Sequence, residues 1–280
     1  MGRQLLVLVV VMVVTCMAVV AVDPLDVVEV RIESVNPNGD LVTTVLGASG
    51  ATSERFVADA DLCVSLAGVE GPEDGDEALY TPFLDEALSG SPKAWVVVTR
   101  QLNGEKVAGF VFLQSNLQIM VNTLVIAAGL ASFDRDALQE GSEYSEGFER
   151  SHLVWLKKSI QIDDVAAGDG DAGPAEYIRV SNQGLLDVDL SGFVVRKPDG
   201  GFSPAPLTGL VLQPGGSVCL IVYMPAGRGV LLDCESLYLL AKGDGSPYAA
   251  EQLRSDEGAV VEIEIRTPDE QAIVARYSST

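Results

Sequence analysis

The chain has 280 residues, enough for two domains that each bury a hydrophobic core. Its 40 acidic residues outnumber 18 basic ones, which gives a net charge of −22, and 48% of its residues are hydrophobic. The apolar content argues against a disordered chain, and the negative charge disfavours generic nucleic-acid binding because it repels phosphates. The same charge either attracts cations and basic partners or serves only solubility. Few aromatic residues and many valines favour strand-rich domains.

An apolar segment opens the chain. Residues 5–22 contain no charge and no proline, with Arg3 before them and Asp23 and Asp26 after them. About 18 apolar residues are near the lower limit for a membrane-spanning helix and long for the core of a signal peptide. Both alternatives export the chain, and the flanking charges place its body outside the cytoplasm. We therefore expect 1–25 to be a signal peptide or a single hydrophobic transmembrane helix, with the retained anchor favoured.

The next region, 26–158, contains strand and helix signals in a recognisable order. A strand-forming run at 27–35 ends in the turn sequence Asn-Pro-Asn-Gly-Asp, and a second strand follows it. The later signals are VSLAGVEGPE at 64–73, a helix at 81–88, strands at 94–98 and 107–113, Val121-Asn122, Gly129-Leu130-Ala131 and a helix ending near Trp155. In this order they resemble the staphylococcal-nuclease-like (thermonuclease) family, which implies a five-stranded OB barrel with a few helices.

The resemblance implies a calcium-dependent nuclease site, and three acidic residues match its positions. Asp40 and Glu70 stand where the family has metal ligands, and Glu73 stands where it has the general base. Calcium prefers several carboxylate and carbonyl oxygens, and a glutamate can orient the attacking water. Asp40, Glu70 and Glu73 are therefore candidate calcium ligands, and Glu73 is the catalytic residue if the domain is active. The alternative is a solvated acidic rim on the barrel.

The two arginines that such a nuclease uses to neutralise the phosphate are not matched. Ser65 takes the first position, and the second falls on Glu105 or Lys106, depending on the alignment. Loss of one preorganised donor to a transition-state oxyanion costs about 3–4 kcal/mol, or roughly 100- to 1,000-fold in rate. We therefore expect a catalytically degenerate domain unless an arginine reaches the site from elsewhere. The candidates for that role are Arg31, Arg55 and Arg100.

The last region, 159–280, reads as short strands separated by marked turns. Glu176 to Phe193, EYIRVSNQGLLDVDLSGF, joins a strand signal to Asn182, Gly184 and a second apolar stretch. Turns at 198–201, 213–216 and 225–229 separate further strand signals, a spacing typical of a β-sandwich. The region resembles the lamin tail domain, an immunoglobulin-like sandwich, and this resemblance implies binding or attachment rather than catalysis.

The few cysteines and the single histidine limit the disulfides, metal sites and catalytic triads that the chain can form. Cys219 and Cys234 lie on consecutive predicted strands and can pair in an exported protein, which leaves Cys63 over. Alternatively, all three are small buried apolar residues. His152 is the only histidine, so a histidine-rich zinc site or a Ser-His-Asp triad has little material, and we expect it to pack beside Trp155.

Together these signals predict an all-β protein with a few helices: an N-terminal hydrophobic helix, an OB-type barrel and an immunoglobulin-like sandwich. We expect it to be secreted or membrane-anchored and to bind a cell-envelope or protein partner without catalysis. The alternative is an extracellular, calcium-dependent nuclease that cleaves phosphodiester bonds. A third interpretation is a purely structural surface protein.

Overall fold

The computed structural model describes residues 27–49, 54–70, 77–89, 93–114, 117–134, 144–167, 175–198, 200, 202, 204–225, 234–249, 253 and 262–279. The predicted signal or anchor segment, 1–25, lies outside these ranges. Within the described ranges, no helix combines the length and the hydrophobicity needed to cross a membrane. The chain divides into two compact units, Met1–Val154 and Trp155–Thr280. Strands predominate in both, and three helices accompany them in the described residues, which confirms the predicted mainly-β class.

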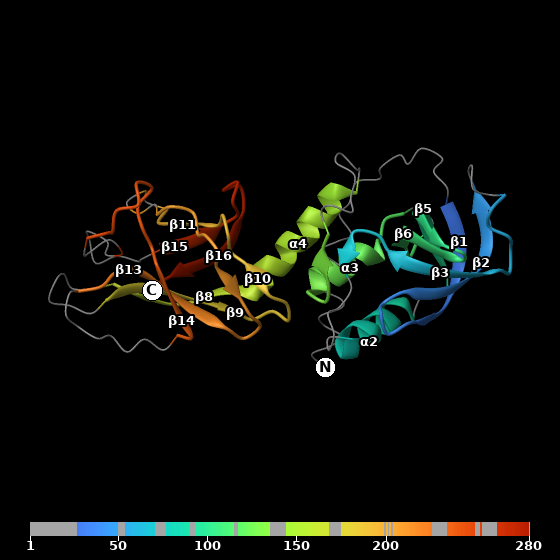
Figure 1. Ribbon diagram of the computed structural model, residues 1–280, viewed down its shortest axis with the longest axis horizontal. Coiled ribbons are helices and arrows are strands. Elements are labelled where there is room, and N and C mark those ends of the chain that lie inside the picture. Colours follow the sequence, from blue (N-terminus) through green and yellow to red (C-terminus); the bar gives the residue numbers. More distant parts are fainter. Residues whose placement is uncertain are drawn as a thin grey trace. The chain divides into compact units, whose positions relative to one another are not determined.

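The first unit is built on a closed five-stranded barrel (Figure 1). Neighbouring strands are antiparallel except β3 and β6, which are parallel. Alternate residues of β3 (Leu62, Val64 and Leu66) are buried in the core, so Cys63 and Ser65 face the other side of the strand. The strands, in their order around the barrel, are β1 (Val27–Val35), β2 (Leu41–Ser49), β3 (Asp61–Leu66), β6 (Lys106–Phe112) and β5 (Lys93–Asn103).

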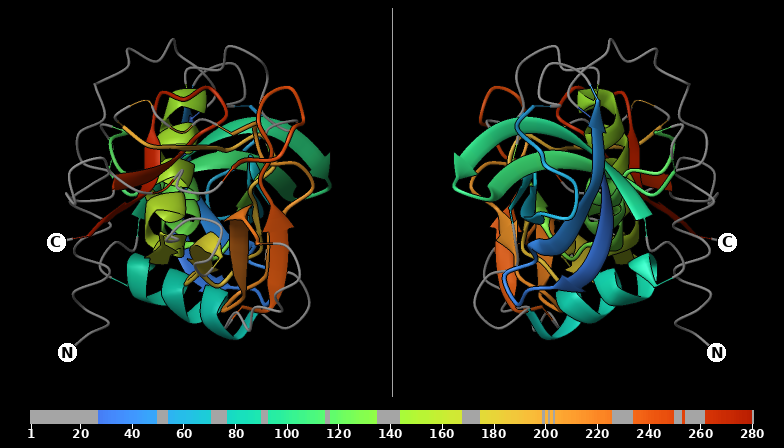
Figure 2. Two further views of the ribbon diagram at one scale, coloured as in Figure 1. Left: turned by 90° about the vertical axis from the view of Figure 1, so that its left-hand side faces the viewer. Right: turned by 90° about the vertical axis from the view of Figure 1, so that its right-hand side faces the viewer.

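Three helices and a small strand pair accompany the barrel in the described residues. Helix α2 (Glu77–Leu88) lies against β1 (Figure 2). Helix α3 (Val121–Ala128) lies against β6. The short strands β4 (Val69–Glu70) and β7 (Ser132–Phe133) pair with each other. Helix α4 (Ser145–Ser159) contains the division between the two units.

A buried asparagine fixes α3 to the barrel. The side chain of Asn122 accepts a hydrogen bond from the Val111 amide at 2.9 Å and donates to the carbonyls of Ala67 and Gly109 at 2.9 and 3.1 Å. A Cβ atom at Gly109 would lie 2.9 Å from the Val97 carbonyl oxygen, so glycine permits this close approach of β5 and β6. The predicted Val-Asn signal therefore marks a structural anchor.

The described residues of the second unit form three sheets. β14–β13–β9–β8 form one, β11–β15–β16 a second and β10–β12 a third, and β16 contacts β8. The bounds are β8 (Ile160–Ala166), β9 (Glu176–Asn182), β10 (Val188–Asp189), β11 (Val194–Arg196), β12 (Val211–Leu212), β13 (Ser217–Tyr223), β14 (Ser236–Leu239), β15 (Glu262–Arg266) and β16 (Ile273–Ser278).

The motif around Asn182 is also structural. Its side-chain amide donates to the carbonyls of Leu186 and Leu212 at 2.8 and 2.9 Å and accepts a bond from the Gly184 amide at 2.8 Å. A Cβ atom at Gly184 would collide with Ser159, which explains the glycine. The Asn-Gln-Gly sequence therefore joins β9 to the segment before β10 and to β12.

The structure also separates the alternatives for the cysteines. Cys219 and Cys234 form a disulfide, with Cα atoms 5.8 Å apart, and Cys63 remains free. The ring of His152 lies 6.5 Å from that of Phe133, in keeping with a packing role.

Candidate functional site

A polar cluster on the outer face of the barrel contains the first predicted metal ligand. The turn that ends at Asp40 is closed by a hydrogen bond from the Gly39 amide to the Asn36 carbonyl at 2.8 Å. Gly39 has a φ of 82°, and a Cβ atom there would collide with the ring of Tyr80 from α2. The Asn-Gly-Asp sequence therefore permits a tight turn under α2 and brings Asp40 to the start of β2, where only 7% of the residue is exposed.

Three side chains bind the Asp40 carboxylate. Ser65 donates its hydroxyl to Oδ1 at 2.5 Å, and Lys106 donates its ammonium to Oδ2 at 2.6 Å. The side-chain amide of Asn38 also donates to Oδ2, at 2.8 Å. Both carboxylate oxygens therefore have protein donors, and the charge of Asp40 is balanced by a lysine.

These contacts decide the protonation of the pair. Burial opposes ionisation of Asp40, but the hydrogen bonds from Lys106, Ser65 and Asn38 outweigh it and lower the pKa of this carboxyl below its usual range. The hydrogen bond to Asp40 raises the pKa of Lys106. At neutral pH the cluster therefore contains an ionised carboxylate and a charged ammonium.

The two other titratable groups at this site are poor nucleophiles or bases. Burial, followed by the charge of Asp40, raises the pKa of the Cys63 thiol, although Lys106 opposes the shift. Burial and the same carboxylate also raise the pKa of the Tyr80 hydroxyl. Both side chains are therefore protonated at neutral pH, and neither is activated for attack.

The other predicted site residues lie apart from this cluster or outside the described ranges. Glu70 is exposed on β4, where its carboxylate accepts a hydrogen bond from Ser132 of β7 at 2.7 Å. Glu73 falls in 71–76, outside the described residues, so its part in a calcium site stays a prediction. In the described parts of the chain, no group of three or more His, Cys, Asp or Glu side chains could hold a metal.

The residues that occupy the two arginine positions of the family differ in whether they contact Asp40. Ser65 and Lys106 both contact Asp40, whereas Glu105 lies in the turn between β5 and β6 and lines a separate cavity. Of the arginines considered as replacements, Arg31 pairs with Glu33 at 2.6 Å and Arg55 lines that cavity. The basic side chain that pairs with the Asp40 carboxylate is Lys106, in place of an arginine.

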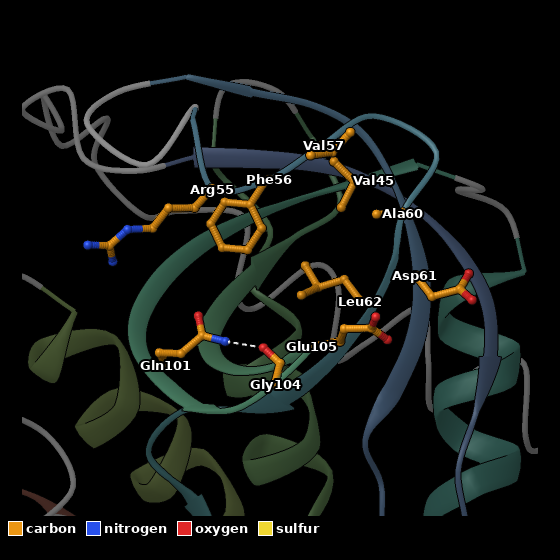
Figure 3. A pocket seen from close by; sticks show the side chains of 10 residues that line it. All are labelled: Val45, Arg55, Phe56, Val57, Ala60, Asp61, Leu62, Gln101, Gly104 and Glu105. Carbon is orange, nitrogen blue, oxygen red and sulfur yellow. Dashed lines mark hydrogen bonds between the residues drawn. The ribbon is translucent and has the colours of Figure 1, made fainter.

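The cavity has a volume of about 550 Å³ and lies at one end of the barrel (Figure 3). Its walls come from β2, the segment before β3, the start of β3, the end of β5, and the turn between β5 and β6. Local sequence patterns do not predict this cavity, because its walls combine a loop with residues of strands that are distant in the sequence. Its lining residues are Val45, Arg55, Phe56, Val57, Ala60, Asp61, Leu62, Gln101, Gly104 and Glu105.

Comparison with models of known protein families found no match to this chain, and comparison with curated proteins found none either. The resemblances to the thermonuclease family and to the lamin tail domain therefore rest on the residues quoted above.

Proposed function

We propose that this protein is exported and membrane-anchored and binds a partner without catalysing a reaction. Its first unit is a nuclease-like OB barrel that lacks the two arginines of the family, and its second unit is a lamin-tail-like, immunoglobulin-type attachment domain. The observation that carries the proposal is the 2.6 Å hydrogen bond from Lys106 to Asp40. It puts an ammonium on the carboxylate that the family resemblance assigns to calcium.

The chemistry of the pair supports this interpretation. For calcium to bind at Asp40, the ammonium of Lys106 would have to leave a carboxylate that is 9% exposed, and a second cation beside it would be repelled. A single lysine also lacks the paired donors with which an arginine holds a phosphate. Calcium binding and phosphate stabilisation are therefore both weakened at this site.

The second unit supports attachment through its architecture. Its sequence motif around Asn182 serves to join strands, and the buried acid Glu264 is paired with Arg266 and Arg276. The side chains of these polar residues are bonded to other parts of the second unit and so stabilise its fold. A stable fold suits a domain that presents a surface to an envelope or protein partner.

The test is cleavage of fluorogenic single-stranded DNA and RNA by the full-length chain, purified in detergent, with calcium at low and high salt. We expect no turnover from protein that unfolds cooperatively in urea, and no heat in a calorimetric titration with millimolar calcium. Calcium-dependent turnover that Glu73→Gln abolishes would overturn the proposal in favour of the nuclease. Glu86→Gln, on the exposed side of α2, is the matched control for loss of one glutamate charge.

A further inference from the structure

The cavity at the end of the barrel has an apolar floor and a charged edge. Val45 and Leu62 are buried, and Phe56 is half-buried with its ring directed into the cavity (Figure 3). The volume of about 550 Å³ lies within the range of roughly 300–1,000 Å³ typical of small-ligand pockets. The floor can therefore cover an aliphatic or aromatic group of a ligand.

The edge has two available carboxylates. Asp61 and Glu105 are exposed on the same side of the cavity, and neither makes a side-chain hydrogen bond or ion pair with any described residue (Figure 3). Arg55 extends away from them (Figure 3). The side chain of Gln101 is already bonded to the Gly104 carbonyl at 2.7 Å. The groups left to orient a ligand over the floor are thus negatively charged.

We propose that this cavity binds the side chain of a lysine or arginine presented by an extended segment of a partner polypeptide. The aliphatic stem packs over Leu62 and Phe56, whose ring face also attracts a cation. The charged end of the side chain meets Asp61 and Glu105. The net charge of −22 favours the approach of a basic partner at long range.

A polypeptide fits these features better than other cationic ligands do. The cavity is larger than one alkylammonium chain, so residues beside the basic one also find room. A metal ion would meet two carboxylates and an apolar floor, with no third His, Cys, Asp or Glu side chain from the described residues. The inference goes beyond the proposed function, since the cavity includes neither Asp40 nor Lys106.

The experiment follows the backbone amide resonances of the full-length protein in detergent during titration with a peptide. The probe is acetyl-Gly-Ala-Lys-Ala-Gly amide, and its control has norleucine in place of lysine. We expect saturable shifts at Leu62 and Glu105 with the lysine peptide and binding weaker by about fivefold or more with the norleucine peptide. Equal binding of the two peptides would overturn the proposal, because the charge would then play no part. Tighter binding of 1,5-diaminopentane than of the lysine peptide would overturn the polypeptide as the source of the cation.

Three variants separate the cavity from the diffuse charge of the protein. Asp61→Asn with Glu105→Gln should weaken the peptide about fivefold, the factor that two partly exposed ion pairs supply. Asp85→Asn with Glu86→Gln removes the same charge from exposed positions on α2 and should leave binding unchanged. Ala60→Phe fills the cavity without changing the charge and should abolish binding, while resonances elsewhere report an intact fold. Equal weakening by the two double variants, or undiminished binding to Ala60→Phe, would overturn the proposal.

Discussion

Each unit contains a buried carboxylate paired with basic side chains, but the two pairs are built differently. In the second unit, the Glu264 side chain is 2% exposed; Arg266 donates twice to its Oε2 atom, and Arg276 binds its Oε1 atom. In the first unit, Asp40 has one cation, Lys106, whose side chain is 31% exposed. The first arrangement is a closed network, in which cations bind both oxygens of the carboxylate. In the second, one cation binds one oxygen, and the remaining donors are the neutral side chains of Ser65 and Asn38.

The largest effect is expected from breaking the closed network. Arg266→Met leaves a buried glutamate with only Arg276, so we expect a loss of about 2–3 kcal/mol in the free energy of unfolding. The measurement is urea unfolding, followed by a probe of the second unit. The matched control is Arg196→Met, because Arg196 pairs with Glu270 and both side chains are exposed to a third or more. A loss above about 1 kcal/mol in the control would contradict the distinction between buried and surface pairs.

A smaller effect is expected from removing the single cation of the first unit. Lys106→Met leaves Asp40 with only the neutral donors Ser65 and Asn38, and we expect a loss of about 1–2 kcal/mol. Lys93→Met, which removes a surface pair with Glu29 in the same barrel, should cost less than about 1 kcal/mol. Calorimetry on the Lys106 variant also shows whether the freed carboxylate gains affinity for calcium. If both variants lose the same stability, Asp40 and Lys106 behave as an ordinary surface pair.

The neutral donor Ser65 should contribute less than the lysine. Ser65→Ala removes one short hydrogen bond to Asp40, and we expect a loss of about 1 kcal/mol. Ser49→Ala is the control, because this exposed hydroxyl is bonded to the Val27 carbonyl at 3.4 Å, near the limit of a hydrogen bond. Both losses are read from the urea midpoint of the barrel. A larger loss at Ser49 would show that the position on the barrel matters more than the carboxylate.

The smallest effect concerns pH. The pKa values of Asp40 and Glu264 are both lowered by folding, so the folded state binds fewer protons than the unfolded state as these groups titrate. Their contribution is complete above the ordinary values of 3.8 and 4.5 and is lost as pH falls through the lower folded values. Urea midpoints should therefore be level from pH 6 to 8 and fall below about pH 4. In Lys106→Met, the fall of the first unit's urea midpoint below about pH 4 should become smaller. An unchanged fall would contradict the attribution of this pH dependence to the pair of Asp40 and Lys106.

The sequence predicted much of the barrel because its strands carry local signals. The strand signals at 27–35, 94–98 and 107–113 and the Asn-Gly-Asp turn all fall within or beside observed strands. Asp40 could therefore be placed at the start of a strand. The expected helix at 81–88 is the second part of α2, which begins earlier, at Glu77. Local patterns identify elements well, although their ends are less certain.

The sequence could not decide whether Glu105 or Lys106 lies beside Asp40, because this depends on the register between β3 and β6. Glu105 and Lys106 are adjacent, and an alignment shift of one residue exchanges their positions. The pairing of Cys63 with Lys106 across β3 and β6 places the lysine beside Asp40 and leaves the glutamate in the turn. This pairing is between parallel strands far apart in the sequence, which no local pattern reports. The cavity was missed for the same reason, because its walls are brought together by the closure of the barrel.

The disulfide between Cys219 and Cys234 makes the two units differ in their response to the redox environment. It closes a loop of 15 residues in the second unit, and such a link stabilises a fold by restricting the unfolded chain. The barrel's Cys63 is a free thiol. A reductant should therefore weaken the second unit and spare the barrel, so material made in a reducing cytosol would contain one fully stabilised half and one weakened half.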